Sequence, residues 1–235
     1  MSGPSTIVTG AGSGIGRATA LLLSGHGHRL TLCGRSEHKL RETERMCLEA
    51  GGPPPLVAHG DLADSGIAHA AVDRTVADRG GLDNLVCCAG VAPKVPIEDT
   101  DESVLEDAFF HNAFAPAFLI VRAWPHFKAR KAGCAVLVSS LASSDPFDGF
   151  LAYGGSKAAV DSYVRSMHRE GRSFGMRAFS IAPGAIETPL LRTIFPEQVV
   201  PRHAALPPVA VAEVIRDCIE GRREHDRGKV IVVAK

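Results

Sequence analysis

The sequence predicts an α/β protein with a doubly wound, seven-stranded parallel sheet covered by helices on both faces. Short β-branched runs alternate with longer helical patterns along all 235 residues, as expected of consecutive strand–helix–strand units. Several of the short runs are wholly apolar, which suits strands buried on both faces of a parallel sheet. The first run ends in a glycine-rich turn that opens a helix. Sheets of this class bind ligands at the carboxyl ends of their strands.

The predicted elements follow one another without a linker, so residues 1–235 are expected to form one domain. The Gly- and Pro-rich residues 51–55 are interpreted as a stiff connector between a helix and a strand. Apolar and β-branched runs predict strands at residues 6–9, 29–33, 56–58, 84–88, 135–139, 177–181 and 229–233. Helical periodicity predicts helices at residues 14–24, 37–50, 64–78, 104–131, 152–174 and 209–220.

Composition argues against several other classes of protein. The chain is 45% hydrophobic and has 26 Lys and Arg against 26 Asp and Glu, so no net charge gathers nucleic acid. No uninterrupted apolar run approaches the ~18 residues of a membrane span. No signal peptide is recognised, so the six cysteines are expected to be reduced and the protein cytoplasmic.

A glycine-rich turn lies between the first predicted strand and the first predicted helix. Glycine occupies positions 10, 12, 14 and 16, where the missing side chains let the backbone approach a pyrophosphate. The start of the helix adds free N–H groups and a partial positive charge. The strict G-x-G-x-x-G pattern is absent, and a tight turn that binds nothing is the alternative. The turn, with Ser13 and Ile15 between its glycines, predicts a nucleotide site.

The end of the second predicted strand bears on which nucleotide binds. A site that prefers NAD usually has a carboxylate about 20 residues after the glycines, where it accepts hydrogen bonds from the ribose. Gly34 and Arg35 occupy that stretch here, and the first carboxylate is Glu37. Arginine is a fixed cation for a 2′-phosphate, so NADP is favoured over NAD. A solvated arginine at a strand end is the alternative.

Tyr153 and Lys157 lie four residues apart at the start of a long predicted helix, which puts them on one face. A nearby ammonium stabilises a phenolate, so the pKa of Tyr153 is expected to fall below its usual value near 10. Ser140 ends the preceding predicted strand, where its hydroxyl can hold a substrate oxygen. This spacing alone is common on surface helices and is weak evidence by itself.

In their order and spacing, these motifs resemble those of the short-chain dehydrogenase/reductase family, in its compact single-domain branch. The resemblance extends over nearly the whole chain and implies a Rossmann-like fold. Besides the glycine turn, it rests on residues 61–62 (Asp-Leu), 87–90 (Cys-Cys-Ala-Gly), 111–112 (His-Asn), 138–140 (Val-Ser-Ser), 153–157 (Tyr-Gly-Gly-Ser-Lys), 183–184 (Pro-Gly) and Thr188.

The resemblance implies a catalytic role for each of four residues. Tyr153 would donate a proton to a carbonyl or accept one from an alcohol, while Ser140 steadies the substrate oxygen. Lys157 would lower the pKa of Tyr153 and grip the nicotinamide ribose. Asn112 would hold a water that connects Lys157 to solvent.

The resemblance also implies a nicotinamide cofactor bound along the strand ends. Asp61 would bind the adenine, and Thr188 the nicotinamide carboxamide. The cofactor exchanges the hydride, while the protein supplies position and the proton. The implied cofactor-binding residues are Gly10, Gly12, Ser13, Gly14, Ile15, Gly16, Arg35, Asp61, Leu62, Ala89, Gly90, Tyr153, Lys157, Pro183, Gly184, Ile186 and Thr188.

Three departures from the family pattern affect these expectations. Cys87 and Cys88 replace an Asn-Asn pair whose amides tie the sheet to the adenosine wall, so cofactor affinity is the property most affected. Adjacent strand residues point to opposite faces, and both cysteines are expected in the core rather than on a metal. Ala182 replaces an Asn before Pro183, and Lys235 ends the chain without a glycine-rich tail, which would alter subunit packing.

The substrate side of the site is expected to be mostly apolar. Residues 141–150 and a short lid at residues 185–208 should lie over the nicotinamide. The alternative is that the apolar side chains of these segments only pack the lid and contact no substrate. The residues concerned are Phe147, Phe150, Leu190, Leu191, Ile194 and Phe195.

The predicted helix at residues 104–131 carries more apolar surface than one sheet face would absorb, so a partner helix is expected. By resemblance the protein would be a homodimer or a homotetramer. Pro116 and Pro125 predict an offset or kink in this helix. His26 and His28 lie in a predicted turn without a third ligand, so a solvated turn is favoured over a metal site.

The sequence therefore predicts an NADP-dependent oxidoreductase that interconverts an alcohol and a ketone or aldehyde, with a small-molecule substrate. A nucleotide-binding regulator of the same fold without turnover is the alternative from another class, against which the complete catalytic positions speak. An epimerase or dehydratase of the extended branch would have a longer chain and a different glycine spacing.

Overall fold

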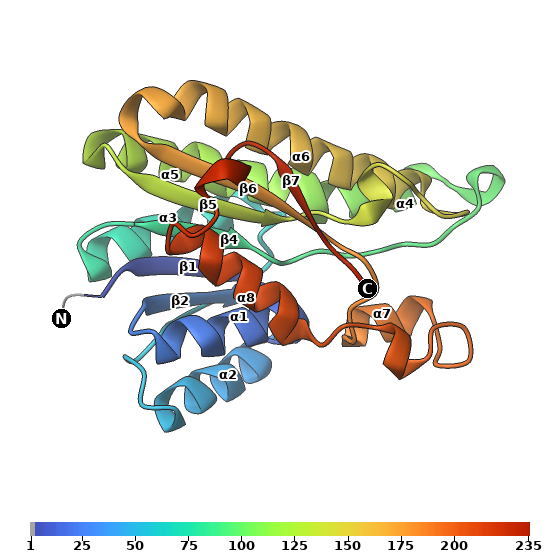
Figure 1. Ribbon diagram of the computed structural model, residues 1–235, viewed down its shortest axis with the longest axis horizontal. Helices are drawn as coiled ribbons and strands as arrows, with labels where there is room; N and C mark the ends of the chain where they lie inside the picture. Colours follow the sequence, from blue (N-terminus) through green and yellow to red (C-terminus); the bar gives the residue numbers. More distant parts are fainter. Residues whose placement is uncertain (1–2) are drawn as a thin grey trace.

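The computed structural model describes residues 3–235 and confirms the doubly wound α/β fold. Seven parallel strands form one sheet in the order β3-β2-β1-β4-β5-β6-β7 (Figure 1). The direction of winding reverses between β1 and β4, and ligands bind such sheets at that point. The strands are β1 Ser5–Thr9, β2 Arg29–Gly34, β3 Leu56–His59, β4 Asn84–Cys87, β5 Gly133–Val138, β6 Met176–Pro183 and β7 Val230–Val233.

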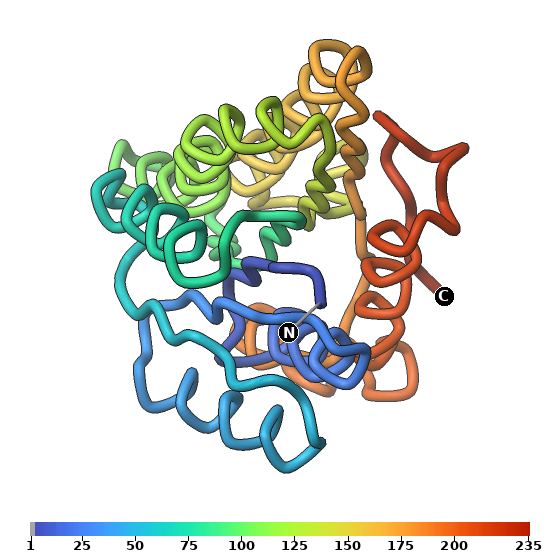
Figure 2. Tube along the Cα trace, turned by 90° about the vertical axis from the view of Figure 1, so that its left-hand side faces the viewer, coloured from blue at the N-terminus to red at the C-terminus, as the bar shows by residue number. Residues whose placement is uncertain are grey.

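Helices cover both faces of the sheet. They are α1 Gly14–Gly25, α2 Glu37–Glu49, α3 Ser65–Arg79, α4 Glu102–Phe109, α5 Ala115–Arg130, α6 Leu151–Gly171, α7 Pro189–Ile194 and α8 Pro208–Ile219. One face is covered by α1, α2 and α8, and the other by α3, α5 and α6, as the two layers in Figure 2 show. The short helix α7 lies outside both layers, beyond the carboxyl end of β6 (Figure 1).

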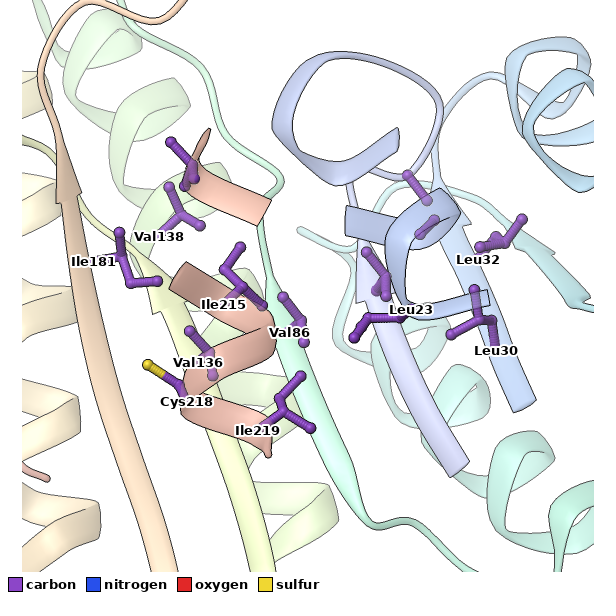
Figure 3. Packing of buried hydrophobic residues seen from close by; sticks show 14 of the residues in the cluster. Leu23, Leu30, Leu32, Val86, Val136, Val138, Ile181, Ile215, Cys218 and Ile219 are labelled. Carbon is purple, nitrogen blue, oxygen red and sulfur yellow. The ribbon is translucent and has the colours of Figure 1, made fainter. Parts of the chain in front are cut away.

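Aliphatic side chains fill the space between the sheet and the layer of α1 and α8 (Figure 3). Leu23 of α1 and Ile215 of α8 are fully buried in one cluster with Val86 and Val136 of the central strands. Burying each such side chain stabilises the fold by about 1.5–3 kcal/mol. The strand ends that carry the candidate site therefore stand on a rigid base.

The ends of the predicted elements shift by a few residues, and capping explains part of this. Asp64 is the N-cap of α3 rather than its first residue, because its carboxylate accepts hydrogen bonds from the N–H groups of Gly66 and Ile67. Strand β5 ends before residue 139. Ser140 therefore lies beyond the strand and caps the short 3₁₀ turn Leu141–Ser143.

The helix predicted at residues 104–131 is two helices joined by a π turn. Helix α4 passes through the π turn Phe110–Phe114 into α5, and Pro116 lies in the first turn of α5. Pro125 lies inside α5. The expected offset near Pro116 corresponds to the π turn. Such turns are frequent at functional sites, and this one carries Asn112.

One helical run has the length and mean hydropathy of a membrane span. The run Glu102–Arg130 consists of α4, the π turn and α5, and 33% of its most apolar window is buried. Its inward side chains, Leu119, Ala123 and Phe127, are at most 1% exposed and pack in the core on the face covered by α3 and α6. Its apolar composition therefore serves partly to cover the sheet.

The cysteines are all unpaired, and every one except Cys88 is buried. The turn with two histidines is only partly solvated, which corrects the prediction. His26 bonds to Glu220 at 2.9 Å, whereas His28 is 3% exposed and bonds to the Thr6 hydroxyl at 2.9 Å. The reason is that His28 precedes β2 directly and joins the polar groups buried at the amino ends of the strands.

Candidate active site

The candidate site lies where β1 and β4 diverge at the carboxyl edge of the sheet. The Thr9 hydroxyl at the end of β1 accepts hydrogen bonds from the N–H groups of Cys88 and Ala89, at 3.1 and 3.0 Å. These bonds hold the segment after β4 beside the glycine turn. Cys87 is buried in the core under α3 and α5, but Cys88 lines a cavity at the site. Cys88 is partly buried against the core on the opposite face of the sheet and also borders the site.

The glycine turn depends on the absence of Cβ atoms. Gly10 and Gly14 have φ angles of +65° and +52°. A Cβ on Gly10 would lie 2.9 Å from the backbone nitrogen of Ala89, and one on Gly16 only 2.3 Å from the Gly10 carbonyl oxygen. The glycines thus let helix α1 begin directly against the strand ends.

The N-terminus of α1 is open to an anion. Within residues 3–235, the N-cap Ser13 makes no side-chain capping bond, and the first turn of α1 holds no acidic residue. Its free N–H groups and dipole are available to a phosphate. Arg17 supports the turn instead of facing the site, because its guanidinium donates to the Gly12 carbonyl at 2.6 Å and pairs with Glu42 at 2.5 Å.

A cavity of about 210 Å³ extends from the glycine turn to the ends of β2 and β3. Arg35 and Lys39 line it, and both are exposed. Lys39 lies over the glycine turn, since its Cβ is 3.0 Å from the position of a Cβ on Gly12. Ser36 and Lys39 are not predicted from the sequence. The signal that could have found them is their place at the start of the helix that follows Arg35.

Asp61 lines the same cavity with a fixed carboxylate. Its Oδ1 accepts from the N–H of Ala63 at 3.0 Å, and its Oδ2 lies 3.2 Å from His111 Nε2. Burial raises the pKa of Asp61, but these bonds and the charge of Arg35 outweigh it and hold that pKa below its usual value. Other predicted residues that line this cavity are Gly10, Gly12, Ser13, Leu62, Ala89 and Gly90.

Tyr153, Lys157 and Ser140 line a second, neighbouring cavity. Helix α6 carries Tyr153 and Lys157 one turn apart, and the turn after β5 carries Ser140, whose hydroxyl accepts from the N–H of Ala142 at 3.1 Å. The Lys157 side chain is buried, donates to the Val138 carbonyl at 2.9 Å, and places Nζ 5.9 Å from the centre of the Tyr153 ring. The structure thus brings the three predicted side chains together.

The pKa of Tyr153 is raised in this structure, which corrects the predicted lowering. Burial of the phenol is the main cause, and hydrogen bonding with Ser140 opposes it. Burial also lowers the pKa of Lys157 to about 8, although Cys88, Cys87 and Asp161 raise it. The Lys157 ammonium does little for the phenolate here because it is turned towards the Val138 carbonyl.

Asn112 links the π turn to the loop after β4 and to helix α6. Its Oδ1 accepts from the N–H of Val91 at 2.8 Å, and its Nδ2 donates to the Val91 carbonyl and the Ser156 hydroxyl, both at 2.9 Å. A Cβ on Gly90 would lie 2.6 Å from Asn112 Oδ1 and 3.3 Å from Lys157 Nζ. Glycine at position 90 therefore allows Asn112 and Lys157 to approach each other.

The segment after β6 forms the opposite wall of the second cavity. Thr188 caps α7 by accepting from the N–H of Leu191 at 3.1 Å, and it donates to the Ile186 carbonyl at 3.2 Å. Its methyl group lies 3.1 Å from the position of a Cβ on Gly14, so this wall reaches the glycine turn. Predicted residues that line the second cavity are Ile15, Gly90, Ser140, Tyr153, Lys157, Pro183, Gly184, Ile186 and Thr188. Gly14, Gly16 and Asn112 line neither cavity.

A third cavity, of about 540 Å³, opens beside Tyr153 and Ser140. Of the apolar residues predicted on the substrate side, all except Leu190 line it; Leu190 lines the second cavity instead. Lys94 and Asp148 also line it and are not predicted. Lys94 comes from the loop after β4, beyond the motif at residues 87–90, so its role depends on the folded geometry.

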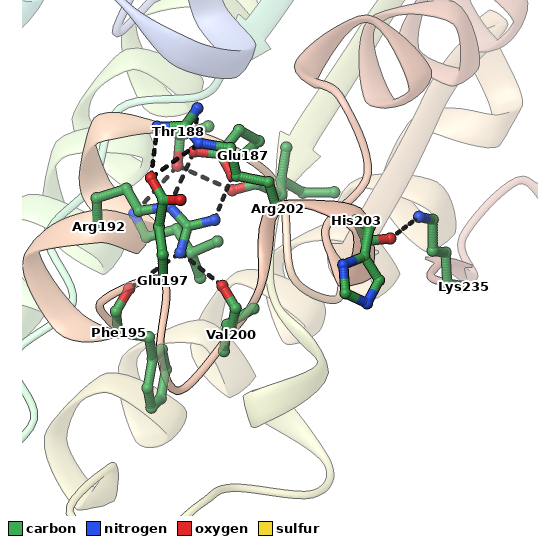
Figure 4. Close-up of polar contacts among 11 residues, drawn as sticks. Glu187, Thr188, Arg192, Phe195, Glu197, Val200, Arg202, His203 and Lys235 are labelled. Carbon is green, nitrogen blue, oxygen red and sulfur yellow. Dashed lines mark hydrogen bonds and ion pairs between the residues drawn. The ribbon is translucent and has the colours of Figure 1, made fainter.

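Ion pairs fix the lid over this third cavity (Figure 4). Arg192 donates through Nε to Glu187 at 2.9 Å, and through Nη1 to the carbonyls of Val200 at 2.7 Å and Phe195 at 3.3 Å. Arg202 adds a second pair to Glu187 at 3.7 Å. One guanidinium thus ties both ends of the lid loop to the residue before Thr188.

The chain matches the family model for short chain dehydrogenases over residues 5–199. It belongs to the short-chain dehydrogenase family. An uncharacterised oxidoreductase of Bacillus subtilis is 32% identical over 205 residues, which cover 86% of this chain and 70% of the relative. A glucose 1-dehydrogenase of Gluconobacter oxydans is 34% identical over 193 residues, which cover 80% of this chain and 71% of the relative. The crystal structure of levodione reductase shares the fold with a TM-score of 0.92 at 23% identity. The match covers 98% of this chain and 96% of that one.

As a short-chain dehydrogenase, the protein is an oxidoreductase that acts on small molecules with a nicotinamide nucleotide. The residues of this chain fit such a cofactor. The uncapped start of α1 offers N–H donors, and the glycine turn leaves room for a close backbone approach. The first and second cavities share Gly90 and Val91, so they form one elongated site along the strand ends, as a dinucleotide requires.

Proposed function

We propose that this short-chain dehydrogenase interconverts an alcohol and a ketone or aldehyde by using NADP(H). The observation that carries the proposal is that Tyr153, Lys157 and Ser140 line one cavity, which continues into the cavity of the glycine turn. The nicotinamide supplies or removes the hydride when it is bound. The chain itself supplies orientation and a proton, acting as one domain over residues 1–235 with its lid at residues 185–208.

Tyr153 donates the proton to the carbonyl oxygen in reduction and accepts it in oxidation. The Ser140 hydroxyl hydrogen-bonds the same oxygen, which stabilises the negative charge that develops there. Lys157 holds the nicotinamide ribose through its ammonium group. Asn112 approaches Lys157 across Gly90, where it holds the water through which protons return from solvent.

NADP is the proposed form of the cofactor. Two cations, Arg35 and Lys39, line the first cavity and would offer charge to a 2′-phosphate. Asp61 holds the adenine in the same cavity, and Thr188 holds the carboxamide in the second cavity. Fixed positive charge at the ribose end favours the phosphorylated cofactor.

Cofactor affinity tests this choice. Fluorescence titration should give at least about tenfold tighter binding of NADPH than of NADH to the native protein. Arg35→Ala should weaken NADPH binding by about tenfold and leave NADH binding nearly unchanged. Arg45→Ala, an exposed arginine of α2 outside the cavities, is the matched control. Equal affinities of the native protein for the two cofactors would contradict the proposal.

Turnover tests the reaction class. Nicotinamide absorbance should change when the enzyme and NADPH are mixed with a panel of ketones and aldehydes, or the enzyme and NADP⁺ with alcohols. Binding of NADPH without turnover of any member of a broad panel would instead favour the regulator without catalysis.

We also propose a homodimer or homotetramer that pairs through the outward face of α5. Val121 there is 68% exposed and, with Ile120 and Trp124, lines an apolar groove against Tyr163 of α6. Light scattering of the native protein should give a dimer or tetramer mass, and Val121→Glu should lower that mass. A monomeric native protein would contradict this assembly.

A further inference from the structure

We infer that the substrate is an uncharged, largely apolar ring compound that carries the reacting carbonyl or hydroxyl group, and not a sugar or another polyol. The inference rests on the proposed function, because it concerns the substrate of the same site. It is drawn from the third cavity, which opens beside Tyr153 and Ser140 and has a volume of about 540 Å³. Cavities of this size hold drug-sized ligands.

Aromatic rings form one continuous wall that starts at the proposed proton donor. The ring of Phe150 lies 5.1 Å from that of Tyr153 and 6.2 Å from that of Phe195, centre to centre. Phe147 closes the set at 6.4 Å from Phe195 and 6.1 Å from Phe150. Interplanar angles of 65° to 76° are edge-to-face arrangements that aromatic rings prefer. Such a wall favours a flat or cyclic apolar surface.

The lid adds aliphatic side chains to the lining. Leu191 and Ile194 come from α7, and Val199 and Val200 from the loop behind it. The Arg192 guanidinium holds the Val200 carbonyl at 2.7 Å, so this part of the lid is positioned before a substrate arrives. Preorganised apolar walls bind an apolar ligand at a smaller cost in conformational entropy.

Four polar or charged side chains line the cavity. Ser140 and Tyr153 are committed to the reacting oxygen, while Lys94 and Asp148 are exposed. A sugar has a hydroxyl on nearly every carbon. Each one that lost water without gaining a partner would cost about 1–3 kcal/mol. The other side chains of the lining are aromatic or aliphatic, so a polyol would leave several hydroxyls without a side-chain partner.

The two exposed charges of the lining do not select a charged substrate. Lys94 and Asp148 line the cavity with opposite signs. The Lys94 ammonium lies 4.8 Å from the centre of the Phe195 ring, a distance at which the ring already attracts the cation. An added carboxylate or ammonium group would therefore lose hydration without a matching field. Of two substrates that differ only in a charged group, the cavity therefore favours the uncharged one.

A substrate comparison with the native enzyme tests the inference. 2-Decalone and 4-methylcyclohexanone represent the expected class, 4-oxocyclohexanecarboxylate is the charged match of the latter, and 2-decalol is compared with D-glucose in oxidation. We expect kcat/KM for the apolar member of each pair to be at least about tenfold higher. Equal or better turnover of the glucose or the carboxylate overturns the inference while supporting the proposed function.

Binding separates the inference from the proposed function. Calorimetry with the NADP⁺-loaded protein measures whether 2-decalone binds more tightly than D-glucose even when neither is turned over. Tighter binding of 2-decalone, combined with no turnover of any ketone or aldehyde with NADPH or of any alcohol with NADP⁺, would contradict the proposed function and support the inference. Binding of 2-decalone no tighter than that of glucose would overturn the inference directly.

A pair of variants places the effect in the cavity. Phe147 lines the cavity and is 67% exposed, so Phe147→Asn disturbs little of the core. It should raise KM for 2-decalone by about tenfold with a small change in kcat. Ile97→Asn is the matched control, because Ile97 is 68% exposed and lies outside the cavity. No difference between the two variants would overturn the proposed role of the aromatic wall.

Discussion

The two halves of the cleft are built from different parts of the chain. The adenosine part of the cofactor half consists mainly of residues that follow β1 to β4, and backbone groups of Gly10, Gly12 and Gly90 contribute to its lining. The substrate half consists mainly of residues 141–150 and 185–200, which lie outside the sheet, and its lining is made of side chains such as Phe147 and Phe195. The first half has a fixed backbone geometry, and the second has an apolar surface.

This difference means that the two halves should respond differently to substitution. In the cofactor half one added carbon can meet backbone atoms, as a Cβ on Gly16 would at 2.3 Å. In the substrate half a side chain can change without moving a strand. Changes in the first half should therefore affect folding and cofactor binding together, and changes in the second should affect mainly the substrate.

The largest effect is expected from Gly16→Ala. The new Cβ would overlap the Gly10 carbonyl, and neither backbone can move without displacing α1 from β1. We expect a destabilisation of more than about 3 kcal/mol, measured by urea unfolding, and loss of NADPH binding. Gly25→Ala, at the other end of the same helix with no atom within 4 Å of its Cβ, should instead be neutral or slightly stabilising. Similar stability of the two variants would refute the close-approach argument.

A smaller effect, confined to the substrate half, is expected from Arg192→Met. The substitution removes the bonds from Arg192 to Glu187 and to the Val200 carbonyl, which hold the lid. KM for a cyclic ketone should rise about tenfold, while the NADPH dissociation constant changes less. Arg202→Met is the control, because its side chain is 66% exposed and an exposed pair contributes under about 1 kcal/mol. Equal losses of cofactor and substrate affinity in Arg192→Met would contradict the separation of the halves.

The smallest effect is expected on the pH profile. The pKa of Lys157 is lowered to about 8, so its charge is lost as pH rises through 8, and kcat/KM for reduction should fall there. The carboxylate of Asp161, one turn along α6, raises that pKa. Asp161→Asn should therefore move the alkaline limb to lower pH and reduce activity at pH 8 a few-fold. Glu170→Gln, at an exposed position of the same helix, should leave the alkaline limb unchanged. If Asp161→Asn does not move the limb either, the limb does not report the titration of Lys157.

Most of the fold and the cofactor half could be predicted because local patterns determine them. The apolar strands and the glycine turn have fixed periods, and Arg35, Asp61 and Thr188 stand at strand ends, where the topology brings them to one edge. Lys39 was not predicted because its position over Gly12 depends on how α2 packs against the turn.

For the substrate half, the sequence predicted the apolar lining but not the charged residues that join it. The apolar residues of the lid are visible in the sequence, but Lys94 and Asp148 reach the cavity through loops whose course no pattern specifies. The direction of the Tyr153 shift in pKa was also beyond the sequence. It depends on burial of the phenol and on the Val138 carbonyl that holds the Lys157 ammonium.

The most direct measurement is the turnover of Tyr153→Phe with saturating NADPH and a ketone that the native enzyme reduces. Loss of the proton donor should lower kcat by about 10²–10⁴-fold, while NADPH affinity and the unfolding midpoint stay close to the native values. A folded Tyr153→Phe enzyme that binds NADPH and reduces the ketone at nearly the native rate would contradict the account.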